Sequence, residues 1–280
     1  MNFKSILAPV GLIMVAMALT MLAPAMTDLA FGNRDWQVFL VSALVSGVAG
    51  LALFTAFRAQ SYKFSRRDAV VFIVMVWVVA GIIGGLPFYF SRLDFGLANS
   101  FFESVSGLTT TGATIMSGLD EMAPGILLWR SILHWIGGIG IVVLSVFIFP
   151  MLSVGGQQLF SLESSDKSDK PFARFADYAS KLLQLYVLIT LLCALSYILL
   201  GMSPFDGINH AMATVSSGGF STSDSSFGQF NSEPLLWAAC VFMLLGGLPF
   251  VTMLRILTRQ RVEIDQQIIY FLSTVLAAGL

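Results

Sequence analysis

Long apolar runs constrain this chain more than any other feature of its sequence. Six of them lie at about residues 5–24, 37–57, 69–90, 125–149, 178–200 and 234–257. A seventh begins near Ile268 and is short. A helix needs about 20 mostly apolar residues to cross a bilayer, and only 11% of this chain is charged, against about 25% in soluble domains. The sequence therefore predicts an all-α polytopic membrane protein surrounded by membrane lipid.

The first run is interpreted as a retained helix. Lys4, the apolar run and Ala23-Pro24-Ala25 together imitate a secretory signal peptide. The run is about 18 residues long, however, whereas the apolar part of a signal peptide usually has about 7–15. A cleaved signal peptide stays open as the alternative.

The distribution of Lys and Arg predicts the topology. With a cytoplasmic N-terminus, 12 of the 15 basic residues fall inside and only Arg34, Arg92 and Arg130 fall outside. Such an excess inside is typical of cytoplasmic loops. The net charge of −1 and the lack of a basic patch give no reason to expect nucleic acid as a partner.

Two further segments, 95–108 and 204–215, are apolar but too short to cross, which is typical of re-entrant half-helices. Asp94 is predicted to cap the first, and Ser203 followed by Pro204 to begin the second. Proline or glycine marks three other helix ends, at Pro124, Pro234 and Gly201. The topology places both short segments on the outer side.

An internal repeat contains these segments. Residues 101–115 align with 208–222 at an offset of 107, so that Gly112 falls on Gly219. Gly137-Gly138-Ile139-Gly140 matches Gly246-Gly247-Leu248-Pro249 at an offset of 109, and these glycines are interpreted as packing positions. The repeating unit is helix, short re-entrant helix, polar loop, helix.

The repeat divides the chain into five predicted parts. They are two N-terminal helices outside the repeat (1–60), a first helix–pore loop–helix repeat (61–150), a cytoplasmic linker (151–177), a second repeat (178–258) and the start of a third (259–280). The linker is either solvated or a contact site for a cytoplasmic partner.

The polar loops after the short helices suit a weakly held cation. Irregular backbone at membrane depth must be buried in protein or line water, and rings of carbonyls can replace the hydration shell of a potassium ion. Glycine adopts the backbone conformations that such carbonyl rings require at little cost in free energy. This is the role predicted for Gly112, Gly218 and Gly219. Hydroxyls add oxygens without fixed charge, at Thr110, Thr111, Ser216 and Ser217. The alternative is that such residues merely allow close helix packing.

Few ionisable groups lie within the apolar segments. Glu103 and His210 occupy the same repeat position, where an intramembrane ionisable group is functional by default or bonds backbone at the base of its loop. His134 is predicted at the membrane interface. Acids near the outer mouth either attract cations or are solvated, namely Asp120, Glu121, Asp206, Asp224 and Glu233. Arg255, Arg259 and Arg261 are expected to anchor the cytoplasmic edge, and Cys193 and Cys240 to be small buried residues without a disulfide.

Three stretches carry a resemblance to a known family. They are 102–114 (FESVSGLTTTGAT), 210–222 (HAMATVSSGGFST) and 134–141 (HWIGGIGI). The first two resemble filter segments of the Trk/Ktr/HKT potassium transporter family, the Trk-H type in particular, and the third is similar to its first inner-helix signature. The resemblance extends over the whole chain.

The resemblance implies four helix–pore helix–helix repeats around a central pore that conducts K⁺ inward across the cell inner membrane. It also implies a homodimer and a cytoplasmic nucleotide-binding regulatory subunit of the Trk-A type, with no organic cofactor in this chain. The matched motifs place the filter at Thr110, Thr111 and Gly112 in the first repeat and at Ser217, Gly218 and Gly219 in the second. Among these, K⁺ would be held at Thr111, Gly112, Gly218 and Gly219, with Glu103 and His210 in supporting roles on the pore helices.

The sequence departs from the family in holding two repeats instead of four. It ends about half a span into the seventh run, so we interpret it as an N-terminal fragment. Two other functions stay open: an intramembrane hydrolase using Ser and His, without a Gly-x-Ser-x-Gly motif, and a truncated chain that only assembles.

Overall fold

The computed structural model describes residues 3–58, 66–152, 171–258 and 266–279. Throughout these ranges the chain is helical and has no strand. The long helices are α1 (Phe3–Thr20), which α2 (Leu22–Ala30) continues, α3 (Trp36–Phe57), α4 (Arg66–Phe90), α6 (Pro124–Leu152), α8 (Pro171–Leu199) and α10 (Glu233–Gly247). The shorter ones are α5 (Leu97–Leu108), α9 (Pro204–Val215), α11 (Phe250–Leu257), α12 (Gln266–Gly279) and the 3₁₀ turns η1 (Leu119–Glu121) and η2 (Ser226–Gln229).

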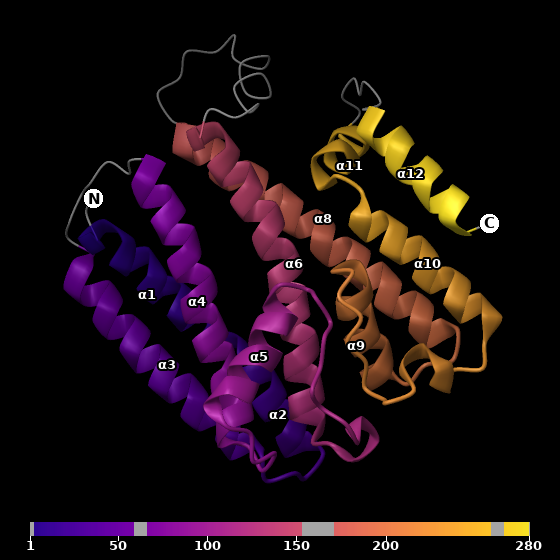
Figure 1. Cartoon of the computed structure of the whole chain (residues 1–280), viewed down its shortest axis with the longest axis horizontal. Coiled ribbons are helices and arrows are strands. Elements are labelled where there is room, and N and C mark those ends of the chain that lie inside the picture. The colour runs from indigo at the N-terminus through magenta and orange to yellow at the C-terminus, as the bar shows by residue number, and fades with distance from the viewer. Residues whose placement is uncertain (1–2, 59–65, 153–170, 259–265, 280) are drawn as a thin grey trace.

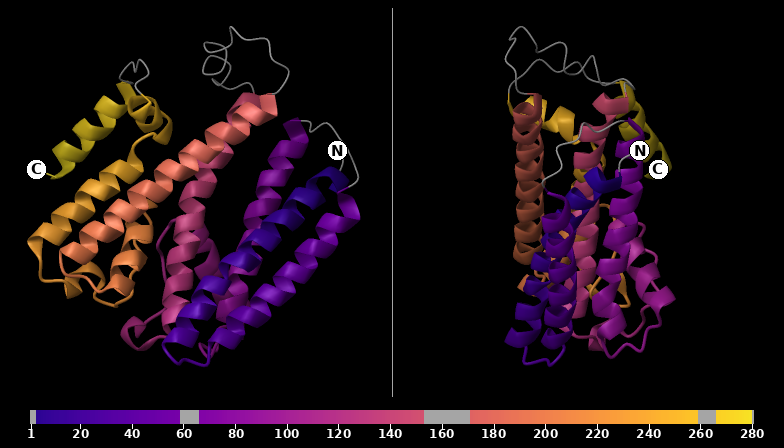
Figure 2. Two further views of the ribbon diagram at one scale, coloured as in Figure 1. Left: turned by 180° about the vertical axis from the view of Figure 1, so that it is seen from behind. Right: turned by 90° about the vertical axis from the view of Figure 1, so that its left-hand side faces the viewer.

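The long helices run between the same two ends of the molecule (Figures 1 and 2). Among the described residues, four helical spans are long and apolar enough to cross a membrane, at Ile6–Ala30, Trp36–Phe57, Arg67–Phe90 and Asp177–Leu199, and the bent pair of α10 and α11 would make a fifth. The first continues six residues beyond the predicted end at residue 24. As predicted, Pro124 begins a helix, α6, and Gly201 follows the end of another, α8. Gly201 has φ +109°, a conformation that suits glycine after a helix.

Both predicted short helices form and lie in the same half of the molecule (Figure 1): α9 has the predicted bounds, and α5 begins at Leu97, two residues later than predicted. Each has 12 residues, about 18 Å of helix and too short for a bilayer. The Ser203 side chain accepts a hydrogen bond from the Asp206 amide, as its predicted capping role requires. The Asp94 cap is wrong: Gly96 precedes α5, and Asp94 itself has φ +54° in the turn before it.

The predicted span 234–257 is not one continuous helix. It divides into α10 and α11, whose axes differ by 96°. Pro249 has no N–H to continue the hydrogen-bond ladder and pushes the preceding residue into extended backbone, and Leu248 has ψ 150°. At the matching place in the first repeat stands Gly140, and α6 runs on through it.

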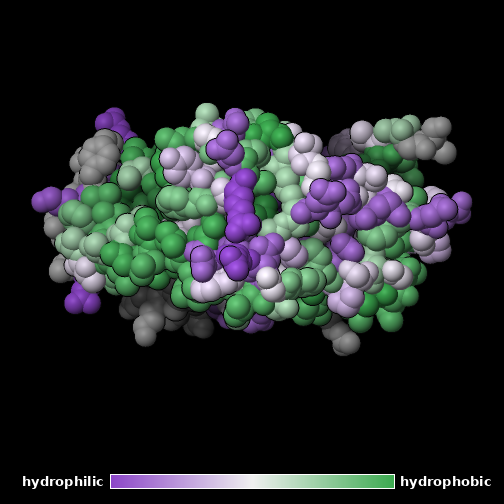
Figure 3. All heavy atoms as spheres, turned by 90° about the horizontal axis from the view of Figure 1, so that it is seen from below, coloured by the Kyte–Doolittle hydropathy of each residue, from purple (hydrophilic) through white to green (hydrophobic). Residues whose placement is uncertain are grey.

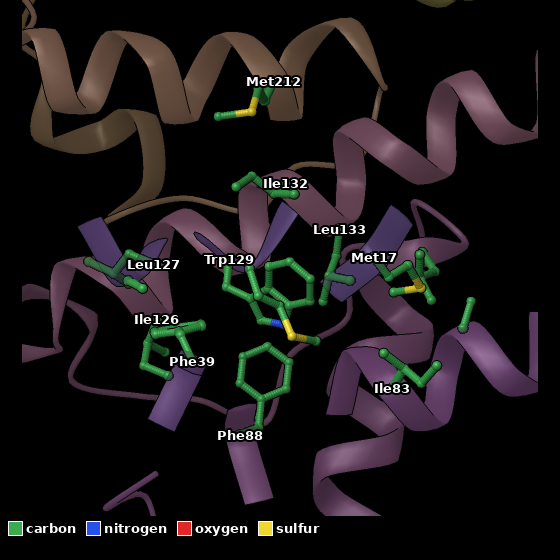
Figure 4. Packing of buried hydrophobic residues seen from close by; sticks show 14 of the residues in the cluster. Met17, Phe39, Ile83, Phe88, Ile126, Leu127, Trp129, Ile132, Leu133 and Met212 are labelled. Atoms are coloured by element: carbon green, nitrogen blue, oxygen red, sulfur yellow. The ribbon is translucent and has the colours of Figure 1, made fainter. Parts of the chain in front are cut away.

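The first hydrophobic core surrounds Trp129 of α6. Figure 4 shows its indole among Phe39 of α3, Phe88 of α4 and Ile126 of α6 itself. The indole N–H donates to the Gly84 carbonyl at 2.8 Å, so the largest core side chain leaves no buried donor unpaired. A second core follows α8 and includes Tyr186 and Tyr197.

The N-terminal helices join the first repeat through a buried carboxylate. Asp28 of α2 is fully buried and accepts a 2.6 Å hydrogen bond from the Gly125 amide at the start of α6. A Cβ at Gly125 would overlap this carboxylate. The contact provides an acceptor for an N-terminal amide of α6. A carboxylate at this position also interacts favourably with the positive end of the helix dipole.

The two cysteines are both free, but only one is buried. Cys193 lies inside the second core, whereas Cys240 is exposed on α10, so its predicted burial is wrong. Periodicity marks an apolar helix without telling which face meets protein and which meets lipid.

Candidate ion-binding loops

Each short helix continues into a polar loop, which we call the first loop (109–118) and the second loop (216–225). Both lie toward the same end of the molecule, where hydrophilic side chains gather among hydrophobic ones (Figure 3). The two loops correspond at the offset of 107 that the sequence alignment uses.

The two loops repeat the same unusual backbone. Thr110 has φ +54° and its counterpart Ser217 has φ +55°; Gly112 has φ +74° and Gly219 has φ +91°. Left-handed conformation is uncommon outside glycine and is a clear outlier for a β-branched threonine. Its occurrence at matched positions shows that the alignment extends to the fold of the main chain.

Hydrogen bonds explain how the helices accommodate these conformations. The Thr111 amide donates to the Ser106 carbonyl at 3.0 Å, and the Gly218 amide donates to the Ala213 carbonyl at 2.9 Å. A bond from the residue after a left-handed position back to the last helical turn is a Schellman ending. Each short helix therefore ends in the same way and directs its partly negative C-terminal end toward its loop.

The loops touch each other at their glycines. A Cβ on Gly112 would overlap the carbonyl oxygen of Gly218. Two predicted site residues from different repeats therefore lie in direct contact. The Thr109 and Thr111 hydroxyls, both exposed, are 2.8 Å apart in the first loop.

Glu103 braces the first loop. Its carboxylate accepts hydrogen bonds from the Thr114 hydroxyl at 2.7 Å and the Ile115 amide at 3.1 Å. It also forms a 3.0 Å ion pair with Arg130 of α6, with side chains 0% and 1% exposed. Of the two predicted roles, these contacts match bonding at the base of the loop.

Arg130 extends this brace to the second loop. Its guanidinium donates to the Thr114 hydroxyl and to the Ser221 carbonyl, each at 3.0 Å. The sequence count placed Arg130 among outer-side charges, but the residue is buried between the repeats. A charge inside an apolar run is the signal that could have marked it.

His210 braces the second loop without a charge pair. Its Nδ1 lies 2.9 Å from the Asp206 carbonyl, which can only accept, so Nδ1 carries the proton. Nε2 then accepts from the Ser221 hydroxyl at 2.9 Å. Ser221 is the counterpart of Thr114, so Glu103–Thr114 and His210–Ser221 are equivalent contacts.

Three of the five predicted outer acids accept hydrogen bonds within the described residues. Asp224 of the second loop accepts bonds from the Gly118 and Leu119 amides, at 2.8 and 3.2 Å, and so joins the loops at their outer ends. Asp206 accepts from the Ser203 and Thr222 hydroxyls, each at 2.7 Å. Asp120 accepts from the Asp224 amide at 3.5 Å; it is exposed, as are Glu121 and Glu233.

The predicted interface position of His134 is wrong. Its side chain is fully buried and stacks on Phe220 of the second loop, with ring centroids 4.0 Å apart. A Cβ at Gly218 would overlap its Nδ1. The imidazole therefore lies directly behind the second loop.

Four of the five predicted packing glycines lie against other groups. A Cβ at Gly137 would overlap the Leu108 carbonyl oxygen, and one at Gly246 would overlap that of Val215. The matched glycines thus press on matched ends of α5 and α9. Gly138 and Gly247 also approach side chains, with Cβ positions 2.6 Å from the Tyr186 hydroxyl and 2.9 Å from the Phe271 ring, whereas Gly140 has no described neighbour within 4 Å.

This geometry defines a class of protein: a helical membrane protein with two matched re-entrant helices, each followed by a loop of glycines and hydroxyl residues. A family model described as TrkH, cation transport protein, matches residues 36–276. The chain belongs to this family.

Similar proteins include the Trk system potassium uptake protein TrkH of Vibrio parahaemolyticus, 38% identical over 253 residues, which cover 89% of this chain and 52% of that protein. TrkI of Halomonas elongata, named likewise, is 38% identical over 271 residues, or 95% of this chain and 55% of that one. The crystal structure of the potassium transporter TrkH from Vibrio parahaemolyticus superimposes with a TM-score of 0.82 at 37% identity, covering 90% of this chain and 51% of that chain. The chain spans about half the length of the relatives it matches.

Proposed function

We propose that this chain forms two of the four pore repeats of a potassium uptake transporter, with the first and second loops as two sides of its ion filter. The observation that carries the proposal is the matched left-handed backbone at Thr110 and Ser217 and at Gly112 and Gly219, with Gly112 seated on the Gly218 carbonyl. Relatives named as potassium uptake proteins support potassium as the transported ion.

In this proposal the ion is held by neutral oxygens. Carbonyls of Thr111, Gly112, Gly218 and Gly219 take the place of water around K⁺, and nearby hydroxyls supply further oxygens. The helix ends behind the loops add a weak negative potential. Binding without a fixed negative charge at the ion keeps release fast enough for conduction. Glu103 and His210 act by holding the loops in shape.

The wider organisation belongs to the same proposal. Residues 1–60 form two helices outside the repeats, 61–150 and 178–258 form the first and second repeats, and a third begins within 259–280. The N-terminus is cytoplasmic, the loops face outward across the cell inner membrane, and the whole transporter is a homodimer with a nucleotide-binding regulatory subunit. The linker 151–177 lies largely outside the described residues, and α8 already begins at Pro171.

The buried histidine–serine contact gives little support to a hydrolase. His210 and Ser221 are both buried, and the same place in the first repeat holds Glu103 and Thr114. Since the same contact is made by different residue types in the two repeats, its common role is to hold the loop in shape, which needs no catalytic serine. The potassium transporters among the relatives point the same way.

The experiment is potassium-limited growth of an uptake-deficient strain that carries the full-length gene. We expect Gly112→Ser to abolish rescue or to relax selection of K⁺ over Na⁺. Gly228→Ser is the control, because Gly228 has no described neighbour within 4 Å and no positive φ. Unchanged flux and selectivity in Gly112→Ser at normal membrane levels would refute the filter. Expressing residues 1–280 alone tests whether two repeats transport by themselves.

A further inference from the structure

One aromatic ring of the second loop, that of Phe220, packs against the first repeat. Phe220 is 3% exposed and stacks on the His134 imidazole at 4.0 Å with an interplanar angle of 16°. The guanidinium carbon of Arg130 lies 4.1 Å from the centre of the same ring. Stacking between rings and cation–π contacts of this kind are both attractive.

The two side chains that hold Phe220 come from one face of α6. Arg130 and His134 are four residues apart, and side chains with this spacing are neighbours on a helix. At the offset of 109 that relates the inner helices, α10 has Ala239 and Met243 instead. The side chains that hold the ring are thus specific to α6 and are absent from the matching helix of the second repeat.

His134 also limits the space behind a proposed ion-binding residue. Its ring nearly touches Gly218, and a Cβ there would overlap Nδ1. Neither ring nitrogen has a hydrogen-bond partner among the described residues. The Gly218 amide is already bonded to the Ala213 carbonyl. The peptide at Gly218 is therefore fixed from the helix side and backed by the imidazole.

We propose that His134 is a positioning residue for the second loop: with Arg130 it holds Phe220, and its ring fixes how far the Gly218 carbonyl can retreat from the ion. Selection among alkali cations is then set partly by a helix of the neighbouring repeat. The imidazole acts by its volume and by stacking, because neither nitrogen bonds any group in the described part of the chain. The proposal rests on the proposed function.

Three variants of the full-length protein test the role of His134. His134→Ala removes the ring, His134→Phe keeps a stacking ring without nitrogens, and Met243→Ala is the control at the matching position of α10. We expect His134→Ala to lower the preference for K⁺ over Na⁺ about tenfold, equivalent to about 1.4 kcal/mol, mainly through the half-saturation constant for K⁺. His134→Phe should keep most of the preference, and Met243→Ala all of it.

A second readout does not depend on transport. The exposed Ser217 is changed to cysteine, and the rate of thiol labelling is measured with and without His134→Ala; Thr111→Cys, also at an exposed position, is the comparison site in the first loop. We expect His134→Ala to accelerate labelling at residue 217 severalfold and to leave residue 111 unchanged. Equal labelling at residue 217 with and without the substitution would overturn the positioning role, as would a selectivity loss in His134→Phe equal to that of His134→Ala. Altered labelling in a protein that does not select K⁺ would instead refute the proposed function and keep the packing role.

Discussion

The two loops share a backbone but differ in how they are supported. The first loop is braced by a buried ion pair, Glu103 with Arg130, and its residues 111–115 are mostly exposed. The second is braced by a neutral histidine, and its residues 220–223 are buried. Equal main-chain conformations are therefore maintained by unequal side-chain chemistry.

The difference shows where a repeated unit is free to change. The left-handed positions recur because the same turn must follow each short helix, and side-chain contacts vary as long as the turn is held. Arg130 of the first repeat supports both loops, so the second loop does not need an arginine of its own. Equivalent substitutions in the two loops should therefore have unequal effects.

The largest contrast is expected between the two loop glycines. In Gly112→Ala, the new Cβ would overlap the Gly218 carbonyl oxygen, and the backbone at φ +74° would be strained for alanine as well, so we expect uptake to be lost. In Gly219→Ala, no described atom lies within 4 Å, and only the strain at φ +91° remains, about 1–2 kcal/mol. Potassium uptake at matched membrane levels measures both. Equal loss in the two variants would show that the loops are functionally symmetric despite their different surroundings.

The next largest difference is expected in thermal stability, between variants of the residues that brace the two loops, Glu103 and His210. Glu103→Gln leaves the buried guanidinium of Arg130 without its counter-charge, and removing one partner of a buried pair costs about 3–5 kcal/mol. His210→Gln can keep one of two neutral hydrogen bonds, and a neutral bond contributes about 1 kcal/mol. Thermal unfolding of the purified full-length protein compares them. A larger shift for His210→Gln would contradict our ranking of the braces.

The sequence predicted the features that depend on local chemistry. Hydropathy located the helices, hydroxyls and glycines located the loops, and the alignment paired Gly112 with Gly219, as their φ angles confirm. The break before Pro249 has a local signal in the sequence Gly246-Gly247-Leu248-Pro249, but the prediction of one continuous span relied on mean hydropathy, which does not register a single proline.

Contacts between repeats could not be predicted in this way. Arg130 and His134 were interpreted by depth along a helix, as an outer charge and an interface residue. Both side chains contact Phe220, which lies about 90 residues further along the sequence. One sequence shows that a side chain is unusual in an apolar run without showing its partner.

The packing glycines extend the comparison to the ends of the short helices. Gly137→Ala and Gly246→Ala would each force a methyl against a matched carbonyl oxygen, of Leu108 or Val215. Overpacking of this kind costs about 1–3 kcal/mol. We expect similar losses of thermal stability in both variants, and none in Gly140→Ala, whose Cβ would meet no described atom within 4 Å. A loss in only one of the pair would indicate that the two helix ends are supported differently, in line with the loops they precede.

The smallest effect is expected where the loops meet at their outer ends. Asp224 is exposed, and its two oxygens accept from the Gly118 and Leu119 amides. Asp224→Asn keeps one acceptor oxygen and should cost less than about 1 kcal/mol in stability, because an exposed bond is readily replaced by water. Its consequence should be in uptake at low potassium, where removing an outer carboxylate slows cation arrival and makes the rate less dependent on ionic strength. Glu121→Gln is the control for charge alone, because Glu121 is exposed near the same end and has no bond between the loops. If both variants slow uptake equally, the carboxylate of Asp224 acts through its charge; if only Asp224→Asn does, the link between the two loops is what matters.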